Sequence, residues 1–312
     1  MRVSVAIPVY NEREVLPELL RRVDAMLDGL PGVGHEIVIA DDGSQDGTRQ
    51  QLLESLPRHP RLRVVLLSRN FGHQAALTAA LDHVRGDVIV MMDGDLQDPP
   101  EAVPGMLAAL ADGNDIAFAV RVDRKEPLLL RVAYAAFYRI LAAVARVEIP
   151  RDAGDFSVMT RRALDVFRSL PERHRFLRGL RAWVGFGQRA VPVAREARFA
   201  GRSKYSLRSL VRLALDGLFS FTTWPIRAAM LVGLAAVVLA TAFSVYSVAA
   251  RLLTGQVPAG FTALVVVTVF LAGMNLFFLG IVGEYVGRIY DEIKQRPHYV
   301  VDRVVGGAPD GG

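Results

Sequence analysis

Two long uncharged apolar runs near the C-terminus constrain the fold of this chain most strongly. Residues 228–250 lie between Arg227 and Arg251, and residues 261–283 end at Glu284. Each run has 23 residues, which as an α-helix extends about 35 Å and is enough to cross the hydrocarbon core of a bilayer. Because a short segment connects them, the sequence predicts a transmembrane helical hairpin. A helical hairpin buried in a soluble protein is the alternative.

Basic residues flank this hairpin unevenly. Arg251 is near the connection, whereas four basic residues lie at the outer ends of the runs: Arg227, Arg288, Lys294 and Arg296. The positive-inside rule then places both termini in the cytoplasm. The apolar run at residues 3–7 is too short for the hydrophobic region of a signal peptide and is typical of a first strand.

Composition narrows the function classes. The chain is 52% hydrophobic and has no cysteine, which excludes disulfides, thiolate metal sites and cysteine nucleophiles. Its six histidines show neither H-x3-H nor H-E-x-x-H spacing, which argues against a zinc enzyme. The net charge of +5 suits an anionic partner. Since the sequence has no stacking-aromatic motif for RNA or DNA, an anionic lipid surface is favoured over nucleic acid.

Strand and helix signals alternate through the first 120 residues or so. Aliphatic, β-branched runs predict strands at 3–7, 36–40, 62–67, 88–92 and 115–119, and helical segments lie between them at 12–27, 47–56, 73–84 and 100–111. This alternation predicts an α/β fold with a doubly wound, mostly parallel sheet. We expect a cytoplasmic globular domain at 1–225, the hairpin at 226–283 and a cytoplasmic tail at 284–312, disordered from Val304 onward.

Two further segments have the composition of amphipathic helices at a membrane interface. Residues 128–147 and 206–222 are apolar on most faces, with arginines at wide intervals. Such helices lie with their apolar face at the acyl boundary and their arginines toward the headgroups. Ordinary core helices are the alternative reading.

An acidic motif follows the fourth predicted strand. The apolar run at 88–92 ends in Asp93 and Asp95, two carboxylates spaced i, i+2. Acids beyond a buried strand hold a hard divalent cation at the C-terminal edge of a sheet, where α/β proteins bind nucleotides. The same spacing occurs in solvated turns, so the motif alone leaves both readings open.

Neighbouring strand ends strengthen the reading of a binding site. Residues 8–12, 41–48 and 119–121 follow the first, second and fifth predicted strands, so they share an edge with residues 93–95. The acids at 41, 42, 93 and 95 would repel one another there without a cation or a hydrogen-bonding ligand. Ser44 or Asp46 could instead cap the next helix, and Tyr10 could pack in the core.

These motifs, in this order, resemble the family-2 GT-A glycosyltransferases. The matching residues are Pro-Val-Tyr-Asn-Glu at 8–12, Asp-Asp-Gly-Ser-x-Asp-Gly-Thr at 41–48, and Asp-Gly-Asp-Leu-Gln-Asp-Pro-Pro-Glu at 93–101. Residues 151–156, residues 198–205 and the hairpin narrow the resemblance to polyprenyl-phosphate glycosyltransferases. That group is related to dolichyl-phosphate mannose synthase, and the chain is closer to the bacterial undecaprenyl-phosphate glucosyltransferase branch. The likeness covers residues 3 to 300.

The resemblance implies roles for the matching positions. The base and ribose pocket would comprise Pro8, Tyr10, Glu12 and Asp41, with Asp42 and Gly94 nearby. Asp93 and Asp95 would bind Mg²⁺ or Mn²⁺ on the diphosphate, with Gln97 beside them. Asp95 would also be a catalytic residue. Arg121, Arg198 and Lys204 would meet phosphate charge from the donor or the lipid acceptor. Arg202 stands where many relatives carry an acid and receives no shared role.

Asp155 is the base candidate by resemblance, in a Gly-Asp-Phe turn suited to projecting into a cleft. Ordering an Arg or Lys side chain, or capping the next helix, is its alternative role. The Gln-x-x-Arg-Trp motif of processive polysaccharide synthases is absent, and residues 178–183 echo it only loosely, which favours transfer of a single sugar.

The implied reaction is an inverting transfer from a nucleotide-diphosphate sugar, UDP-glucose being favoured, to a membrane polyprenyl phosphate. The implied location is a bacterial-type cytoplasmic membrane. GDP-mannose-dependent mannosyl transfer and a non-catalytic membrane homologue are the alternatives. A nucleotidyltransferase would need a glycine-rich phosphate loop, which residues 8–12 do not supply. Four glycines in and after the second apolar run would allow close helix approach and a homo-oligomer, at positions 273, 280, 283 and 287.

Overall fold

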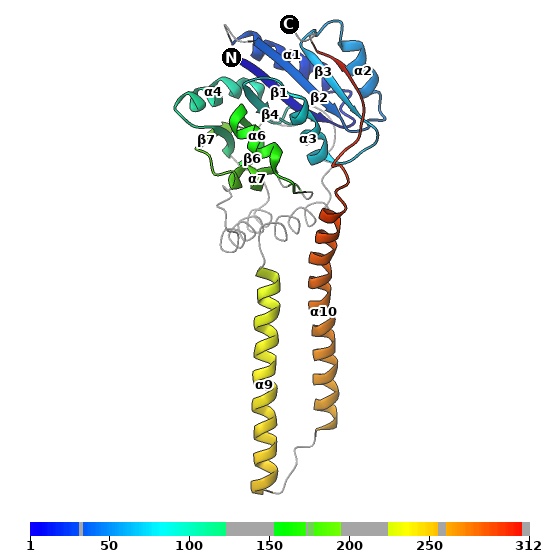
Figure 1. The fold of residues 1–312 in the computed structure, drawn as a ribbon, viewed down its shortest axis with the longest axis vertical. Coiled ribbons are helices and arrows are strands. Elements are labelled where there is room, and N and C mark those ends of the chain that lie inside the picture. The colour runs from blue at the N-terminus through cyan, green and yellow to red at the C-terminus, as the bar shows by residue number, and fades with distance from the viewer. Residues whose placement is uncertain are drawn as a thin grey trace. The chain divides into compact units, whose positions relative to one another are not determined.

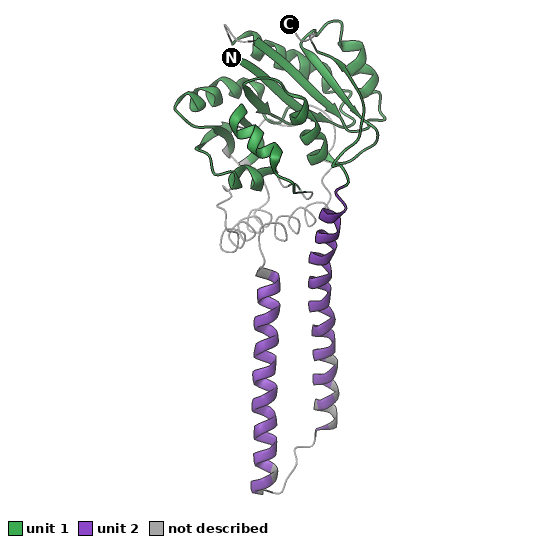
Figure 2. Cartoon of the chain, in the orientation of Figure 1, with its two compact units in different colours: residues 1–143, 147–217, 296–312 green, residues 144–146, 218–295 purple. Residues whose placement is uncertain are grey.

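A computed structural model describes residues 1–30, 34–122, 153–172, 175, 177–194, 224–254 and 260–307. The chain divides into two compact units, one of residues 1–143, 147–217 and 296–312 and the other of residues 144–146 and 218–295 (Figure 2). The interface helices predicted at 128–147 and 206–222 lie outside the described residues, as do Arg198 and Lys204.

The first unit contains an eight-stranded sheet with the strand order β7-β5-β6-β4-β1-β2-β3-β8 (Figure 1). The strands are β1 (Arg2–Val9), β2 (Gly34–Asp41), β3 (Leu62–Leu67), β4 (Val88–Met91), β5 (Ile116–Val122), β6 (Ala153–Thr160), β7 (Gln188–Ala194) and β8 (Val301–Gly306). β1 pairs in parallel with β2 and β4, β2 with β3, and β5 with β7. β6 and β8 run antiparallel to their neighbours. The predicted mostly parallel sheet is confirmed.

Helices cover the sheet as the alternating side chains of buried strands require. One apolar cluster joins alternate residues of β1, such as Val5 and Ile7, to Leu19 of α1 (Leu16–Asp28), Leu52 of α2 (Thr48–Ser55) and Met106 of α4 (Val103–Ala111). α3 (His73–His83) contacts β1, β2 and β3, and β6 is contacted by α6 (Arg161–Ser169) and α7 (Leu177–Trp183). The doubly wound arrangement is therefore confirmed.

Prolines explain two differences from the predicted helix boundaries. The first helix begins at Leu16 rather than at residue 12, with Pro17 in its first turn. The segment predicted as one helix at 100–111 starts as a 3₁₀ turn, η1 (Pro100–Ala102), and becomes α-helical at Val103. Pro104 has no N–H to donate to the carbonyl four residues earlier, so an α-helical hydrogen bond cannot form there.

The C-terminal segment corrects a prediction. β8 pairs antiparallel with β3, Ser68 N donates to Val300 O at 3.0 Å, and Gly307 N donates to Leu62 O at 2.7 Å. The disorder expected from Val304 is therefore wrong for residues 304–307. The physical reason is non-local, because β8 satisfies the backbone groups that β3 would otherwise expose at the sheet edge.

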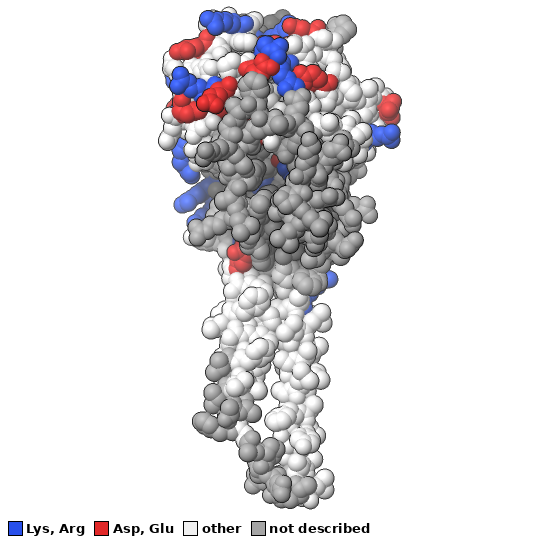
Figure 3. Space-filling model, turned by 180° about the vertical axis from the view of Figure 1, so that it is seen from behind, with Lys and Arg blue, Asp and Glu red and all other residues white. Residues whose placement is uncertain are grey.

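The second unit holds two long apolar helices, α9 (Trp224–Thr254) and α10 (Phe261–Ile293), which contact each other. Within them, Pro225–Ala250 and Val266–Ile293 are long and apolar enough to cross a membrane, and their most apolar stretches are not buried inside the described structure. On the face shown in Figure 3, most of the described surface of these helices carries no charged side chain, whereas charged residues gather on the sheet-containing unit. Both helices extend beyond the predicted ends at 250 and 283.

Candidate active site

Strand register brings two distant aspartates together at the C-terminal edge of the parallel strands. β4 pairs antiparallel with β6, and Met91 lies opposite Ser157. Asp93 lies two residues beyond this end of β4, and Asp155 lies two residues before Ser157 on β6, so the pairing brings the two carboxylates close enough for their oxygens to lie within 4.8 Å of each other. Side chains alternate between the two faces along a strand. Asp93 and Asp155 are therefore expected on the same face of the sheet as the side chains of Met91 and Ser157.

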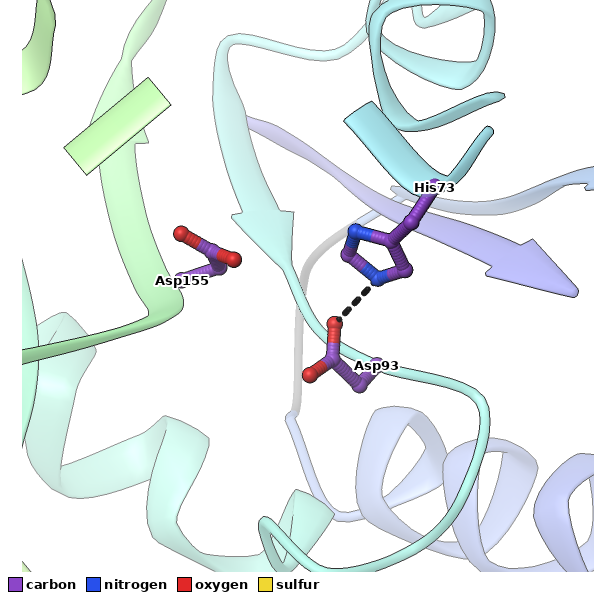
Figure 4. Close-up of side chains that lie close together, drawn as sticks. All are labelled: His73, Asp93 and Asp155. Atoms are coloured by element: carbon purple, nitrogen blue, oxygen red, sulfur yellow. Dashed lines mark hydrogen bonds and ion pairs between the residues drawn. The ribbon is translucent and has the colours of Figure 1, made fainter. Parts of the chain in front are cut away.

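The N-terminus of α3 supplies a histidine to this pair of acids. His73 Nε2 donates to Asp93 Oδ1 at 2.9 Å (Figure 4). The loop before α3 is fixed by the buried Asp42, whose carboxylate accepts hydrogen bonds from Phe71 N at 2.7 Å and Gly72 N at 2.9 Å. Asp42, directly after β2, thus holds the loop that leads into α3 and His73.

An arginine from α7 neutralises the second acid. Arg178 Nε donates to Asp155 Oδ1 at 2.8 Å, and its Nη2 donates to Asp155 Oδ2 at 3.3 Å. Gln74 links this pair to α3, because its Nε2 donates to Asp155 Oδ2 at 3.4 Å and its Oε1 accepts from Leu177 N at 3.3 Å. Both oxygens of this buried carboxylate are therefore occupied by side-chain donors.

A second arginine on α7 fixes the start of β6. Arg181 is fully buried, donates from Nη1 to Gly154 O at 3.0 Å and lies over the Phe118 ring, 4.8 Å from its centroid. Burial lowers the pKa of Arg181 to about 10, which still leaves it charged at neutral pH. Arg178 and Arg181 are one helical turn apart. The same short helix therefore supplies the counter-charge for Asp155 and a hydrogen bond to the backbone of the strand that carries it.

The charges of the cluster determine its protonation. Burial lowers the pKa of His73, but the charge and hydrogen bond of Asp93 outweigh burial and raise that pKa to about 9. Burial also raises the pKa values of Asp93 and Asp155. At Asp93, the charge and hydrogen bond of His73 more than offset the effect of burial. At Asp155, the charge and hydrogen bond of Arg178 do the same. Both pKa values therefore lie below the usual range for aspartate. At neutral pH the cluster holds two carboxylates and two cations, His73 and Arg178.

His73, Asp93 and Asp155 also form a set of donors that could hold a metal ion. One ligand atom from each of the three lies within 4.8 Å of the others. Oxygen and imidazole donors together suit Mn²⁺, and the carboxylates suit Mg²⁺. Asp95, predicted as the second metal ligand, is not in this set of donors. Its Oδ1 accepts from Gln97 N at 3.1 Å, within the loop that follows β4.

The ends of β1 and β2 form the neighbouring part of the edge. Asp41 has no exposed surface, and its carboxylate accepts from Ser44 N at 3.2 Å and from Arg49 Nε at 2.8 Å. The loops after the two strands are joined, because Asn11 N donates to Ser44 Oγ and Glu12 N donates to Thr48 Oγ1, each at 2.9 Å.

Gly94 brings the β4 loop against this part of the edge. A Cβ at position 94 would lie 3.0 Å from Pro8 O and 2.9 Å from Val9 Cγ1, so only glycine allows this approach. Pro8 and Gly94, predicted to share a pocket, are thus neighbours, and Tyr10 is half-buried at the same strand end.

The sequence interpretation misplaced two site residues and missed four. Asp155 lies within the strand β6, not in a turn. This strand pairs antiparallel with β4, more than sixty positions away, and no local sequence pattern indicated that pairing. Arg121 was predicted to follow the fifth strand, but it lies within β5, which continues to Val122.

The four missed residues are His73, Gln74, Arg178 and Arg181. Two local signals could have pointed to them. Position 73 follows Gly72 at the start of a helix after a parallel strand, and the two arginines are three residues apart on one helical face.

The mostly parallel sheet and the acidic cluster at its C-terminal edge define an α/β protein with a charged site at the edge where such folds bind nucleotides. The chain belongs to glycosyltransferase family 2, because the family model described as Glycosyl transferase family 2 matches residues 4–167 and similar relatives span nearly the whole chain. One relative, from Bacillus subtilis (strain 168), is described as uncharacterized glycosyltransferase YkcC. It is 38% identical over 304 residues, which cover 97% of this chain and 94% of that protein.

A second relative is the SfII prophage-derived bactoprenol glucosyl transferase of Shigella flexneri. It is 34% identical over 310 residues, which cover 99% of this chain and all of that protein. Among solved structures, glucosyl-3-phosphoglycerate synthase from Mycobacterium tuberculosis in complex with Mn²⁺, UDP-glucose and phosphoglyceric acid is 21% identical, with a TM-score of 0.47. That alignment covers 69% of this chain and 76% of the other.

Proposed function

We propose that this chain transfers a single sugar from a nucleotide-diphosphate sugar, UDP-glucose being favoured, to a membrane polyprenyl phosphate. The observation that carries the proposal is the cluster of His73, Asp93 and Asp155 at the carboxyl ends of parallel strands, where α/β proteins bind nucleotides. The full-length match to a relative named bactoprenol glucosyl transferase supports the glucosyl donor and the lipid acceptor. GDP-mannose as donor is the second candidate.

Asp93, with Asp95 as proposed partner, would hold a divalent cation, Mg²⁺ or Mn²⁺. The Asp93 carboxylate already pairs with one cation, the protonated His73 side chain, through Oδ1. The Asp95 carboxylate is oriented by the hydrogen bond that it accepts from Gln97 N. A bound divalent ion would neutralise charge that develops on the departing diphosphate. Asp41, Asp42, Pro8, Tyr10, Glu12 and Gly94 would receive the base and ribose, and Arg121, Arg198 and Lys204 would meet phosphate oxygens.

The acceptor supplies the nucleophile. A phosphomonoester carries about 1.5 to 2 negative charges near pH 7 and so needs little deprotonation, by analogy with phosphorylated side chains. One of its oxygens bonds to the anomeric carbon while the bond from that carbon to the diphosphate oxygen breaks. In-line displacement inverts the configuration, so an α-linked donor gives a β-linked lipid phosphosugar.

The contacts of Asp155 support an ordering role over a base role. Arg178 and Gln74 occupy both of its oxygens, and its lowered pKa makes it a weak proton acceptor at neutral pH. An Asp155→Asn variant separates the two roles. Base catalysis predicts a loss of about 10² to 10⁴ in kcat, whereas ordering of Arg178 predicts a raised KM with kcat within about tenfold of wild type.

Membrane attachment would keep the catalytic unit close to its lipid acceptor. We assign residues 1–225 to a cytoplasmic catalytic domain and 226–283 to a membrane hairpin. The sheet supports this topology, because β1 precedes the hairpin and β8 follows it, yet both belong to one sheet. The two ends of the hairpin must then emerge on the same side of the membrane, and the positive-inside rule makes that side the cytoplasm.

The test is transfer of label from a panel of UDP- and GDP-sugars to polyprenyl phosphate in membranes, with and without chelator. We expect a chloroform-soluble product from UDP-glucose that disappears with chelator and returns with Mn²⁺ or Mg²⁺. Asp93→Asn should abolish it, whereas Asp28→Asn, at an exposed acid on α1, should not. No lipid product from any donor, with the protein folded and inserted, would refute the proposal; a product that survives chelator would refute only the metal assignment.

A further inference from the structure

The buried carboxylate of Asp41 depends on a residue outside the acidic cluster. A fully buried carboxylate is costly unless a cation or several hydrogen bonds compensate it. One Asp41 oxygen accepts from Ser44 N at 3.2 Å, and the other accepts from Arg49 Nε of α2 at 2.8 Å. Arg49 thus supplies the charge that balances Asp41, and its position decides how that carboxylate is oriented.

Arg49 is itself held from the far edge of the sheet. Its Nη2 donates to Leu67 O at 2.6 Å, at the end of β3. Its Nη1 lies 3.9 Å from Asp302 Oδ2 on β8, the strand that follows the second apolar helix. One guanidinium therefore connects the ends of β2 and β3 to the C-terminal strand.

The C-terminal strand is firmly attached where it meets Arg49. Leu67 pairs with Val301 directly beside Asp302, and Tyr299 Oη donates to Asp82 Oδ2 of α3 at 2.7 Å. At the other end, Gly306 turns with φ near +75°, and a Cβ there would lie 2.5 Å from Leu62 O. Hydrogen bonds on one side of Asp302 and close backbone packing on the other thus fix its place.

From these contacts we infer that Arg49 is a positioning residue for the nucleotide pocket and that Asp302 of the C-terminal strand acts on the pocket through it. This inference rests on the proposed function, in which Asp41 contacts the base or ribose of the donor. Arg49 is half-buried and bonded to Asp41, so its effect passes through the orientation of that carboxylate. The segment after the membrane hairpin is then a structural part of the donor site.

The test is titration of UDP into the detergent-solubilised full-length protein by calorimetry, with donor and acceptor kinetics on the same samples. Arg49→Gln should weaken UDP binding about tenfold, the scale of one charge-assisted hydrogen bond. It should raise the donor KM in proportion and leave the acceptor KM and kcat at saturating donor unchanged. Arg49→Lys should recover part of the loss, because lysine keeps the charge and loses the planar fork.

Two further variants make the test specific. Arg61→Gln removes an exposed arginine that pairs with Asp28 at 2.7 Å, and it should leave UDP binding unchanged. Asp302→Asn should weaken UDP binding about twofold, as expected of a long, exposed ion pair, and should have no further effect when Arg49→Gln is present.

The outcomes separate this inference from the proposed function. UDP affinity within twofold of wild type in Arg49→Gln, with or without a lower Tm, would overturn the positioning role alone. An Asp302→Asn effect that is absent, or that persists in the Arg49→Gln background, would overturn the link to the C-terminal strand. A wild-type protein that binds neither UDP nor GDP, with or without Mn²⁺, would overturn the proposed function and this inference with it.

Discussion

Replacing Arg178 by methionine tests the electrostatics of the candidate site. Asp155 has 6% of its side chain exposed, and Arg178 is its strongest partner, with nitrogen–oxygen distances of 2.8 and 3.3 Å. The substitution keeps most of the apolar length of the side chain and removes the guanidinium. Gln74 remains as a weaker donor at 3.4 Å. The variant therefore leaves a buried carboxylate without its counter-charge.

The expected cost follows from the burial of the pair. Removing one partner of a buried ion pair typically destabilises a protein by about 3–5 kcal/mol. Because Arg178 is itself 21% exposed and Gln74 stays in place, we expect a value near the lower end, about 3 kcal/mol. For a unit of this size that corresponds to a fall in Tm of about 6–12 °C.

The loss should depend on pH with a definite sign. The pKa of Asp155 in the folded protein lies below its usual value, so its stabilising contribution is present at neutral pH and disappears as the pH falls through that lowered value. In Arg178→Met, burial is no longer opposed by the guanidinium, and Asp155 takes up a proton at a higher pH. The gap in Tm between wild type and variant should be full at pH 7.5 and narrow below about pH 5.

The assay is thermal unfolding of the full-length protein in detergent across this pH range. Arg162→Met is the matched control, because Arg162 pairs with Asp115 at 2.5 Å with 69% of its side chain exposed, and it should cost at most about 1 kcal/mol. The double variant Arg178→Met with Asp155→Asn should regain at least half of the decrease in Tm that Arg178→Met causes. A fall no larger than that of Arg162→Met, or a gap that does not narrow in acid, would refute the reasoning.

Three other substitutions have defined outcomes. Asp93→Asn should remove Mn²⁺ binding measured by calorimetry in the presence of UDP; retained binding would exclude Asp93 as a ligand. Gly94→Ala should place a Cβ 3.0 Å from Pro8 O and cost about 1–3 kcal/mol, seen as a lower Tm with weaker UDP binding. Tyr299→Phe removes the hydrogen bond to Asp82 and should lower the Tm by about 2–4 °C, about 1 kcal/mol, and an unchanged Tm would show that this contact does not stabilise the fold.

Local patterns in the sequence determined the catalytic sheet and one part of its site. Aliphatic runs alternating with helical segments predicted the first five strands within a few residues, because buried parallel strands leave continuous apolar runs. The position of Asp41 and Asp93 at strand ends followed from the same patterns, since parallel strands share one carboxyl edge. The two apolar runs also stood out without tertiary information, because their length and lack of charge are properties of the chain itself.

Only the tertiary structure decided which side chains meet. Asp155 reaches Asp93 because β6 enters the sheet antiparallel beside β4, a pairing between segments far apart in the chain. His73 and Arg178 join them from two different helices, and β8 closes the sheet edge after the second apolar helix. Periodicity in a sequence records whether a residue is buried, but strand order, register and ion pairs depend on contacts between distant segments. The sequence therefore determined the elements and the acidic edge, and long-range packing determined the cluster that lies there.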